Sequence, residues 1–281
     1  MHRHTPLLLS AICLCLGAFQ TSSAQEQYNL SYRFAKDKTY RVIDTIKVES
    51  NQEIMGRESN STSTVVATTK IQPTEVADNG TTTLVSSIES LSMRFQNMQI
   101  DTTIVPRELV GQRTRLTVSK LGQTIKREVL DTVKLSGLAA TTGQRELVRL
   151  HIYPGHPVKA GEKWTASRMD TSDAGGNYSV VGTTIDYTLV GKEKRHGRDQ
   201  LRITFSGKLT LSGKGNTMGN DYVVEGSGKM TGTTFVNPQT GLSEADDSKT
   251  DMDLSVAVTG QQNLTIPTTQ SIVTHRKLVV E

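Results

Sequence analysis

Cysteine is almost absent from this 281-residue chain, and the two copies, Cys13 and Cys15, both lie near the N-terminus. Both follow bulky residues where lipoprotein processing needs a small side chain, so we do not expect lipidation. The chain beyond residue 24 can form no disulfide, and it offers neither a thiolate metal ligand nor a cysteine nucleophile. Aromatic residues make up only 5% of the sequence, so aliphatic side chains must supply most of the buried area that stabilises the fold.

Long hydrophobic runs are also lacking. The most apolar stretch, residues 7–19, spans 13 residues, whereas a transmembrane helix needs roughly 20. Basic residues 1–4 precede it and small residues 22–24 follow it, which is the order typical of a secretory signal peptide. We therefore predict a signal peptide over residues 1–24, cleaved near Ala24, and no transmembrane segment in the mature chain. An exported chain without disulfides suits a bacterial periplasm or outer surface.

A strong excess of either charge is missing as well. The 32 lysines and arginines against 28 aspartates and glutamates give a formal charge of +4, and these residues are spread along the chain. A nucleic-acid-binding protein or a protein that adsorbs to anionic membrane by charge alone would carry a concentrated basic patch. We therefore expect no nucleic-acid partner.

What the sequence does contain is alternation of apolar and polar residues with a period of two. In residues 201–211 the odd positions are mostly apolar and the even positions are polar, and similar alternation occurs in residues 40–48, 181–189 and 252–258. This pattern predicts extended strands with one buried face and one solvated face. Strands of this kind are typical of antiparallel sheets.

Turn residues separate these runs. Asn79-Gly80 is a strong hairpin signal because both residues tolerate the positive φ angles of a type I′ turn. Gly122, Gly197 and Gly241 occupy comparable places between other runs, so short hairpins are expected throughout. The glycines of residues 226–232 fall inside a strand pattern and predict a bulge or bend.

Only one segment predicts a helix. Apolar residues between Thr142 and Ile152 have three- and four-residue spacing, Thr142 is a suitable cap, and Pro154 and Pro157 would end the helix. We interpret residues 141–159 as a connector with a short helix.

The predicted fold class is all-β and antiparallel, with two similar curved sheets or half-barrels joined by the short helical connector. The corresponding divisions are an N-terminal β half over residues 25–140 and a C-terminal β half over residues 160–281. Their turns have similar spacing, which either a duplication or chance would produce.

No motif predicts a catalytic, cofactor or metal site. The chain lacks a P-loop, a Gly-x-Ser-x-Gly elbow and an HExxH helix. Its histidines outside the leader lack metal-ligand spacing: His151, His156, His196 and His275. One stretch is acidic, but its alternation is that of a wet strand face and not of a calcium loop: Glu244, Asp246, Asp247, Asp251 and Asp253.

Residues 152–164 combine Pro154, Pro157-Val158, Gly161-Glu162 and Trp164. This combination resembles a segment of an uncharacterised exported bacterial β-protein family, a domain of unknown function. The resemblance extends through the Tyr-x-Leu-x-Gly strand at residues 187–191 and covers mainly residues 152–205. It implies an exported β protein and no catalytic residue.

Three large aromatic side chains stand out as core residues or, alternatively, ligand-binding platforms: Tyr40, Trp164 and Tyr187. We expect an exported, non-enzymatic binding or structural protein without a cofactor, whose partner is a lipid, a glycan or an envelope protein. One alternative is a carrier of a lipid or other apolar ligand in a β cavity. Another is a hydrolase with an unrecognised carboxylate site, which a buried acid beside a histidine would favour.

Overall fold

A computed structural model describes residues 26–131, 148–174, 177–217, 219–260 and 263–281. Nearly all regular structure in these residues is β-strand, and the single helical element among them is the short 3-10 helix η1 (Arg107–Leu109). No helix in the described ranges has the length and hydrophobicity required to cross a bilayer. The predicted signal peptide lies outside the described residues.

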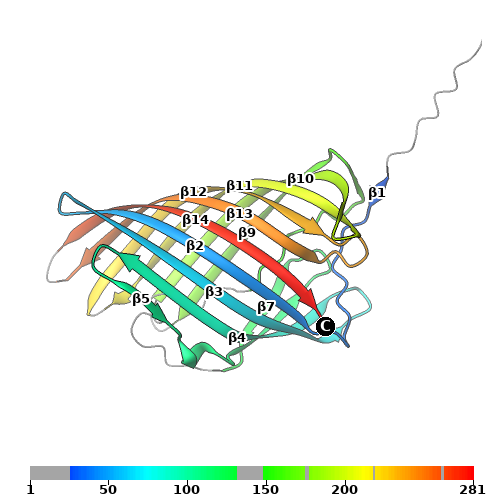
Figure 1. Ribbon diagram of the computed structural model, residues 1–281, viewed down its shortest axis with the longest axis horizontal. Coiled ribbons are helices and arrows are strands. Elements are labelled where there is room, and N and C mark those ends of the chain that lie inside the picture. The colour runs from blue at the N-terminus through cyan, green and yellow to red at the C-terminus, as the bar shows by residue number, and fades with distance from the viewer. Residues whose placement is uncertain (1–25, 132–147, 175–176, 218, 261–262) are drawn as a thin grey trace, which may run out of the picture.

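Twelve strands form one antiparallel sheet (Figure 1). They are β2 (Tyr40–Ile54), β3 (Arg57–Val76), β4 (Thr82–Asn97), β5 (Asp101–Ile104), β6 (Arg113–Val118), β7 (Thr124–Val129), β9 (Lys163–Ala174), β10 (Asn177–Arg195), β11 (Arg198–Thr217), β12 (Asn220–Val236), β13 (Ser243–Thr259) and β14 (Leu264–Val280). A separate two-stranded sheet pairs β1 (Gln27–Tyr28) with β8 (Val158–Lys159).

The order of the large sheet is β7-β6-β4-β3-β2-β14-β13-β12-β11-β10-β9, with β5 added on β4. Most pairs join sequence neighbours, as the turn signals predict, and the exceptions in this sheet are β14 with β2 and β4 with β6. Figure 1 shows the resulting arch, with the blue β2 and the red β14 side by side. The two edge strands, β7 and β9, therefore lie in the middle of the sequence, on either side of the connector.

The predicted all-β antiparallel class is confirmed, but the predicted division into two sheets is not. Strands of residues 25–140 and 160–281 pair within one curved sheet through β2 and β14. A period of two indicates that a strand has one buried face, and it does not show whether that face closes on a second sheet or on the same sheet curling round. Whether the halves arose by duplication stays a prediction.

The predicted connector helix is not confirmed either. Residues 141–147 lie outside the described residues, and residues 148–152 have no regular structure. Val148 and Tyr153 of this irregular segment are buried in the core, and the Tyr153 N–H donates to the Leu121 carbonyl at 2.9 Å. Residues 148–153 therefore bury single side chains in the core from an irregular backbone, and not from the apolar face of a helix.

The core occupies one end of the sheet, which we call the proximal end, where β2 starts and β14 finishes. Irregular residues 29–38 and 148–162 close this end with aromatic side chains. Tyr32 stacks on Tyr153 at 4.8 Å between ring centroids, and the Tyr153 hydroxyl donates to the Gly241 carbonyl at 2.7 Å. Trp164 stacks on Tyr187 at 5.2 Å. The strands extend well beyond this core into what we call the distal half.

The glycines of β12 do not form the predicted bulge. The pairing of β12 with β13 shifts register only between Phe235 and Val236. A Cβ at Gly226 would collide with Leu254, which is its direct partner in the register, and a Cβ at Gly232 would collide with Phe205, its partner on β11. These glycines leave room for large side chains of the neighbouring strands to lie across them.

Candidate functional site

The side of the sheet that carries the core residues is called the inner face here. It changes character along the strands. At the boundary between core and distal half, four polar residues follow one another across β12, β13, β14 and β2: Thr234, Asp246, Arg276 and Asp44. On β12 to β2 this polar row marks the end of the proximal core, whereas on β10 and β11 the buried Tyr187 and Phe205 lie one step further along the strands.

Charges in the polar row are tightly paired. Arg276 donates from Nε and Nη2 to the two carboxylate oxygens of Asp44 at 2.7 and 3.1 Å, and from Nη1 to the Arg149 carbonyl at 2.9 Å. Asp44 is only 1% exposed. A bidentate, buried pair of this kind fixes both side chains and leaves neither charge uncompensated.

Asp246 contacts a histidine from the connector. The His151 Nε2 atom lies 2.7 Å from Asp246 Oδ1, and the imidazole ring packs near Tyr187 and Phe205 at 5.8 and 5.3 Å. This is the buried acid beside a histidine that a hydrolase would use. A nucleophile would need a hydroxyl on the other ring nitrogen, and no serine or threonine hydroxyl bonds to His151 among the described hydrogen bonds. The contact orients the connector against the sheet.

The polar row makes stability depend on pH. Burial acts to raise the pKa of the Asp246 carboxyl, but the neighbouring His151, Thr234 and Arg276 outweigh it and lower the pKa from 3.8 to about 2. A carboxyl with a depressed folded-state pKa stabilises the fold above its unfolded pKa, and that contribution is lost as the pH falls through the folded value.

We therefore expect the free energy of unfolding to fall by about 2 kcal/mol between pH 4 and pH 2 through Asp246 alone. Urea unfolding followed by circular dichroism at several pH values in this window measures it. Other carboxylates titrate here as well, so Asp246→Asn is the reference. Its stability should depend less on pH by that amount, and an unchanged dependence would contradict the assignment.

Beyond the polar row, the inner face of the sheet from β10 to β3 carries no charged side chain among the described residues before the distal turns. Aliphatic side chains and methionines dominate it, and most are only half-buried: Val48, Leu209, Leu211, Met230, Met252, Leu254, Val256, Ile266 and Ile272. Met230 packs against the proximal core cluster, and the others belong to neither hydrophobic core cluster. The charged residues of the same strands alternate onto the outer face.

The edge strand β9 is the exception. Its Arg168 and Asp170 occupy inner-face positions opposite Thr183 and Val181 of β10. Arg168 Nε lies 2.9 Å from Asp170 Oδ2, and Arg149 of the connector lies 3.2 Å from the same oxygen. Inward-pointing charges on an edge strand discourage pairing with another chain, so this pair protects the edge.

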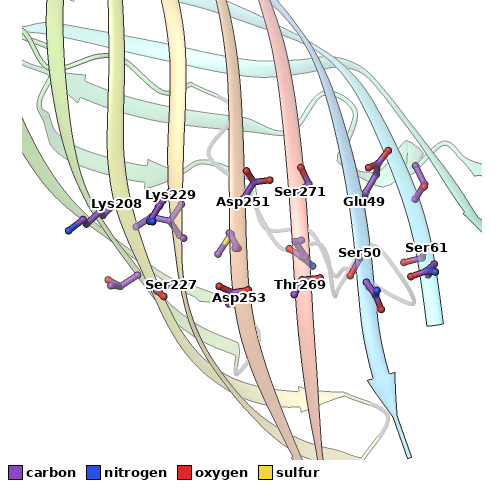
Figure 2. Close-up of a pocket in the computed structure, with 18 residues that line it drawn as sticks. Glu49, Ser50, Ser61, Lys208, Ser227, Lys229, Asp251, Asp253, Thr269 and Ser271 are labelled. Atoms are coloured by element: carbon purple, nitrogen blue, oxygen red, sulfur yellow. The ribbon is translucent and has the colours of Figure 1, made fainter. Parts of the chain in front are cut away.

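A cavity of about 820 Å³ lies against the middle of the sheet (Figure 2). Three rows of residues line it across β11, β12, β13, β14, β2 and β3. The central row belongs to the inner face: Leu209, Gly228, Met252, Gln270, Ser50 and Ser61. The two flanking rows have outer-face positions, and Figure 2 shows one of them in a line across the strands, from Lys208 through Asp251 to Glu49.

Charged groups of this lining are partly neutralised by neighbours. The Glu49 carboxylate lies 2.6 Å from Lys47 Nζ, and hydrogen bonds from Lys249 and Ser271 lower the pKa of Asp251. No group of three or more potential metal ligands occurs in the described part of the chain. The cavity therefore offers hydrogen-bonding groups without a convergent acid and base.

All three aromatic residues singled out from the sequence lie buried in the proximal core: Tyr40, Trp164 and Tyr187. Tyr187 pairs with Phe205, which lies four residues before the cavity residue Leu209 on β11, and a role of the three aromatic residues in ligand binding stays untested. Sequence reasoning missed the polar row. It grouped Asp246 with the wet-face acids, although Asp246 shares the sequence parity of Met252 and Leu254, which are inner-face residues.

Comparison with known proteins finds a family match over part of the chain and no activity. Two solved structures cover 88% of this chain with low similarity: an outer membrane channel (COG4313) from Pseudomonas putida F1 and OccK2 (OpdF) from Pseudomonas aeruginosa in complex with glucuronate. The identities are 10% and 8%, the TM-scores 0.30 and 0.26, and the covered shares of those chains 97% and 99%. No curated protein matches. Residues 148–243 match the model of a family of unknown function (DUF6263), which confirms the predicted resemblance to an uncharacterised family.

Proposed function

We propose that this chain is an exported, non-enzymatic binding protein of the bacterial envelope, and that it holds an apolar, chain-like ligand of the acyl type on the distal inner face. The observation that carries the proposal is the aliphatic, half-exposed surface beyond the polar row, on which no charge of the described residues falls from β10 to β3 before Arg57 at the β2–β3 turn. Such a surface is expensive to leave in water, at about 25 cal/mol per Å².

The dimensions of this surface suit an extended chain. Along β13 the inner face presents Met252, Leu254, Val256 and Val258 in succession. Alternate residues of a strand are about 6.6 Å apart, so these four side chains cover about 20 Å. The glycines of β12 beside them carry no side chains that would obstruct this stripe. A long acyl chain lying along the strands would contact this stripe over much of its length.

The chemistry of the surface limits the ligand as well. A charged headgroup buried on it would find no opposite charge, and an unpaired buried charge is costly. Toward β2 and β3 the inner face changes to hydroxyl and amide side chains, including Ser50, Ser61 and Gln270. These can hydrogen-bond an ester, amide or hydroxyl group. We therefore favour the uncharged portion of a lipid over an ionic metabolite.

Native purification followed by solvent extraction and mass spectrometry tests the proposal directly. We expect roughly one lipid or other acyl-chain compound per protein chain. The stripped protein should rebind a fluorescent fatty-acid probe with saturable, one-to-one stoichiometry. A native preparation without any stoichiometric apolar compound, together with no saturable probe binding, would refute the proposal.

A pair of substitutions on β13 tests whether the ligand binds on the inner face. Val256 lies on the inner face, and Ser255 points outward from the same strand. Val256→Lys should weaken probe binding at least tenfold because it puts a charge on the apolar stripe, whereas Ser255→Lys should leave it unchanged. The measurement is probe titration of both variants, with urea unfolding to establish that each is folded. Equal affinities would place the ligand elsewhere.

A further inference from the structure

The turns at the distal end of the sheet expose large apolar side chains. Met55 and Gly56 form the two-residue turn between β2 and β3, with φ values of +51° and +76°. Asn, Asp and Gly are favoured where a turn needs positive φ, and an unbranched apolar residue is not. Met55 is nevertheless 69% exposed. The unfavourable backbone conformation of Met55 is therefore not offset by burial of its side chain within the described structure. This indicates a role for the side chain in contact with another molecule.

A second turn with exposed apolar side chains, residues 98–100, joins β4 to β5. Its hydrogen bonds are made by Asn97, whose Oδ1 accepts from the backbone N–H groups of Gln99 and Ile100 at 2.8 Å each. Met98 at the tip is 90% exposed, and Ile100 is 54% exposed. Neither side chain is needed for the turn itself. We call Met55, Met98 and Ile100 the distal rim.

The distal rim lies where the apolar inner face ends. Figure 1 shows the β2–β3 turn and the β4–β5 turn at the end of the sheet opposite the C-terminus. Ile54, the last inner-face residue of β2, directly precedes Met55. On β13 and β14 the inner face ends in Val258 and Leu264, which pair with each other. An apolar chain passing from the rim to the stripe would therefore meet one charge, Arg57, which pairs with Ile54 beside the turn, and no other charged inner-face residue of the described strands from β10 to β3.

We propose that the distal rim contacts the surface of a lipid bilayer, and that the apolar ligand passes there between the bilayer and the inner face. The proposal rests on the function proposed above. A bilayer fits better than a protein partner, because the rim consists of separate protruding side chains on narrow hairpin tips. A stable protein interface needs about 800 Å² on each partner, whereas single apolar side chains enter the interfacial region of a membrane independently.

The charge around the rim indicates how it would bind. Arg94 and Asp101 flank the β4–β5 turn and form an ion pair with 2.8 Å between Nη2 and Oδ2. The turn therefore presents no free cluster of basic residues for anionic headgroups. Contact should depend on the apolar side chains and should persist at high salt, which screens exposed charges.

Flotation with neutral phosphatidylcholine vesicles, at low and high salt, tests the contact. The rim variant carries Met55→Ser, Met98→Ser and Ile100→Ser. The control variant carries Ile125→Ser and Val280→Ser, which remove exposed apolar side chains (60% and 50%) near the proximal end. We expect the wild type and the control to float at both salt concentrations, and the rim variant to bind vesicles at least tenfold more weakly.

Three results would overturn the membrane contact: a wild type that does not float, a rim variant that floats like the wild type, or binding that disappears at high salt. Titration with the fluorescent fatty-acid probe in solution separates this failure from failure of the proposed function. The rim variant should bind the probe like the wild type but take it up from vesicles at least tenfold more slowly. Vesicle binding without any probe binding would refute the proposed ligand but not the proposed membrane contact.

Discussion

Replacement of Asp44 by alanine is expected to lower the free energy of unfolding by about 3 to 5 kcal/mol. Asp44 is 1% exposed, and both of its carboxylate oxygens accept hydrogen bonds from Arg276. Alanine would remove the bidentate carboxylate from the largely buried guanidinium and leave Asp246 as the neighbouring negative charge. The cost is therefore the desolvation of Arg276, which the remaining bond to the Arg149 carbonyl offsets only in part.

Asp247 provides the matched control for this experiment. It lies on β13 beside Asp246 but on the outer face, and its Oδ1 atom is 2.7 Å from His275 Nδ1. Both side chains are largely exposed, and exposed ion pairs contribute about 0 to 1 kcal/mol. Equilibrium unfolding in urea, followed by circular dichroism, should separate Asp44→Ala from Asp247→Ala by several kcal/mol. Equal losses of unfolding free energy would show that breaking the buried pair costs no more than breaking an exposed contact.

A double replacement tests whether charge itself is needed. Asp44→Leu combined with Arg276→Met keeps the side-chain volume and removes both charges. Replacement of buried ion pairs by apolar residues is often neutral, so the double variant should recover most of the stability that Asp44→Ala loses. This outcome would show that the ion pair contributes little net stability. Its remaining role would be to position the connector through Arg149.

Strand identity and face could be predicted from the sequence because both are local. Alternation in residues 201–211 predicts a strand whose odd positions are buried, and β11 buries Leu201, Ile203 and Phe205. Hairpin turns also depend on a few residues. Gly80, Gly122 and Gly197 all have positive φ, but Asn79 does not, so the turn at Asn79-Gly80 is not the predicted type I′ turn.

The polar row could be predicted only in part because its pairs are remote in sequence. Asp44 and Arg276 are 232 residues apart, and His151 and Asp246 are 95 residues apart. Their pairing depends on β14 closing on β2 and on the path of the connector. The parity of the positions did carry information, since Asp44 falls between Val42 and Ile46 on an apolar face. A charge at an inward position implies a buried partner.

The predicted helix is not confirmed in residues 148–152, and the glycines of β12 form no bulge, for a common reason. Both were local interpretations of residues whose environment is set by distant strands. Gly232 accommodates Phe205 of β11, and Val148 fills the proximal core from an irregular segment. Tertiary packing overrides weak local preferences of this kind.

Variants of the single tryptophan, Trp164, test whether the aromatic residues act in core packing or in ligand contact. Trp164 stacks on Tyr187 with 5.2 Å between centroids and an interplanar angle of 11°, and its Nε1–H donates to the Ile152 carbonyl at 3.0 Å. Trp164→Ala removes this packing and leaves the carbonyl without its partner. Loss of a large buried aromatic costs about 3 to 5 kcal/mol, and we expect a decrease of this size in the free energy of unfolding.

Trp164→Phe is the control that separates core packing from ligand contact. It keeps an aromatic ring against Tyr187 but loses the hydrogen bond, so about 1 to 2 kcal/mol should be lost. Circular dichroism must follow unfolding, because Trp164 is the only tryptophan. Neither variant should change fatty-acid probe affinity while folded, since Trp164 is buried against Tyr187 in the core cluster and the proposed ligand lies on the half-exposed stripe of β13. A large loss of affinity in a Trp164→Phe protein of near-normal stability would instead make this ring a ligand platform and move the binding site into the proximal end.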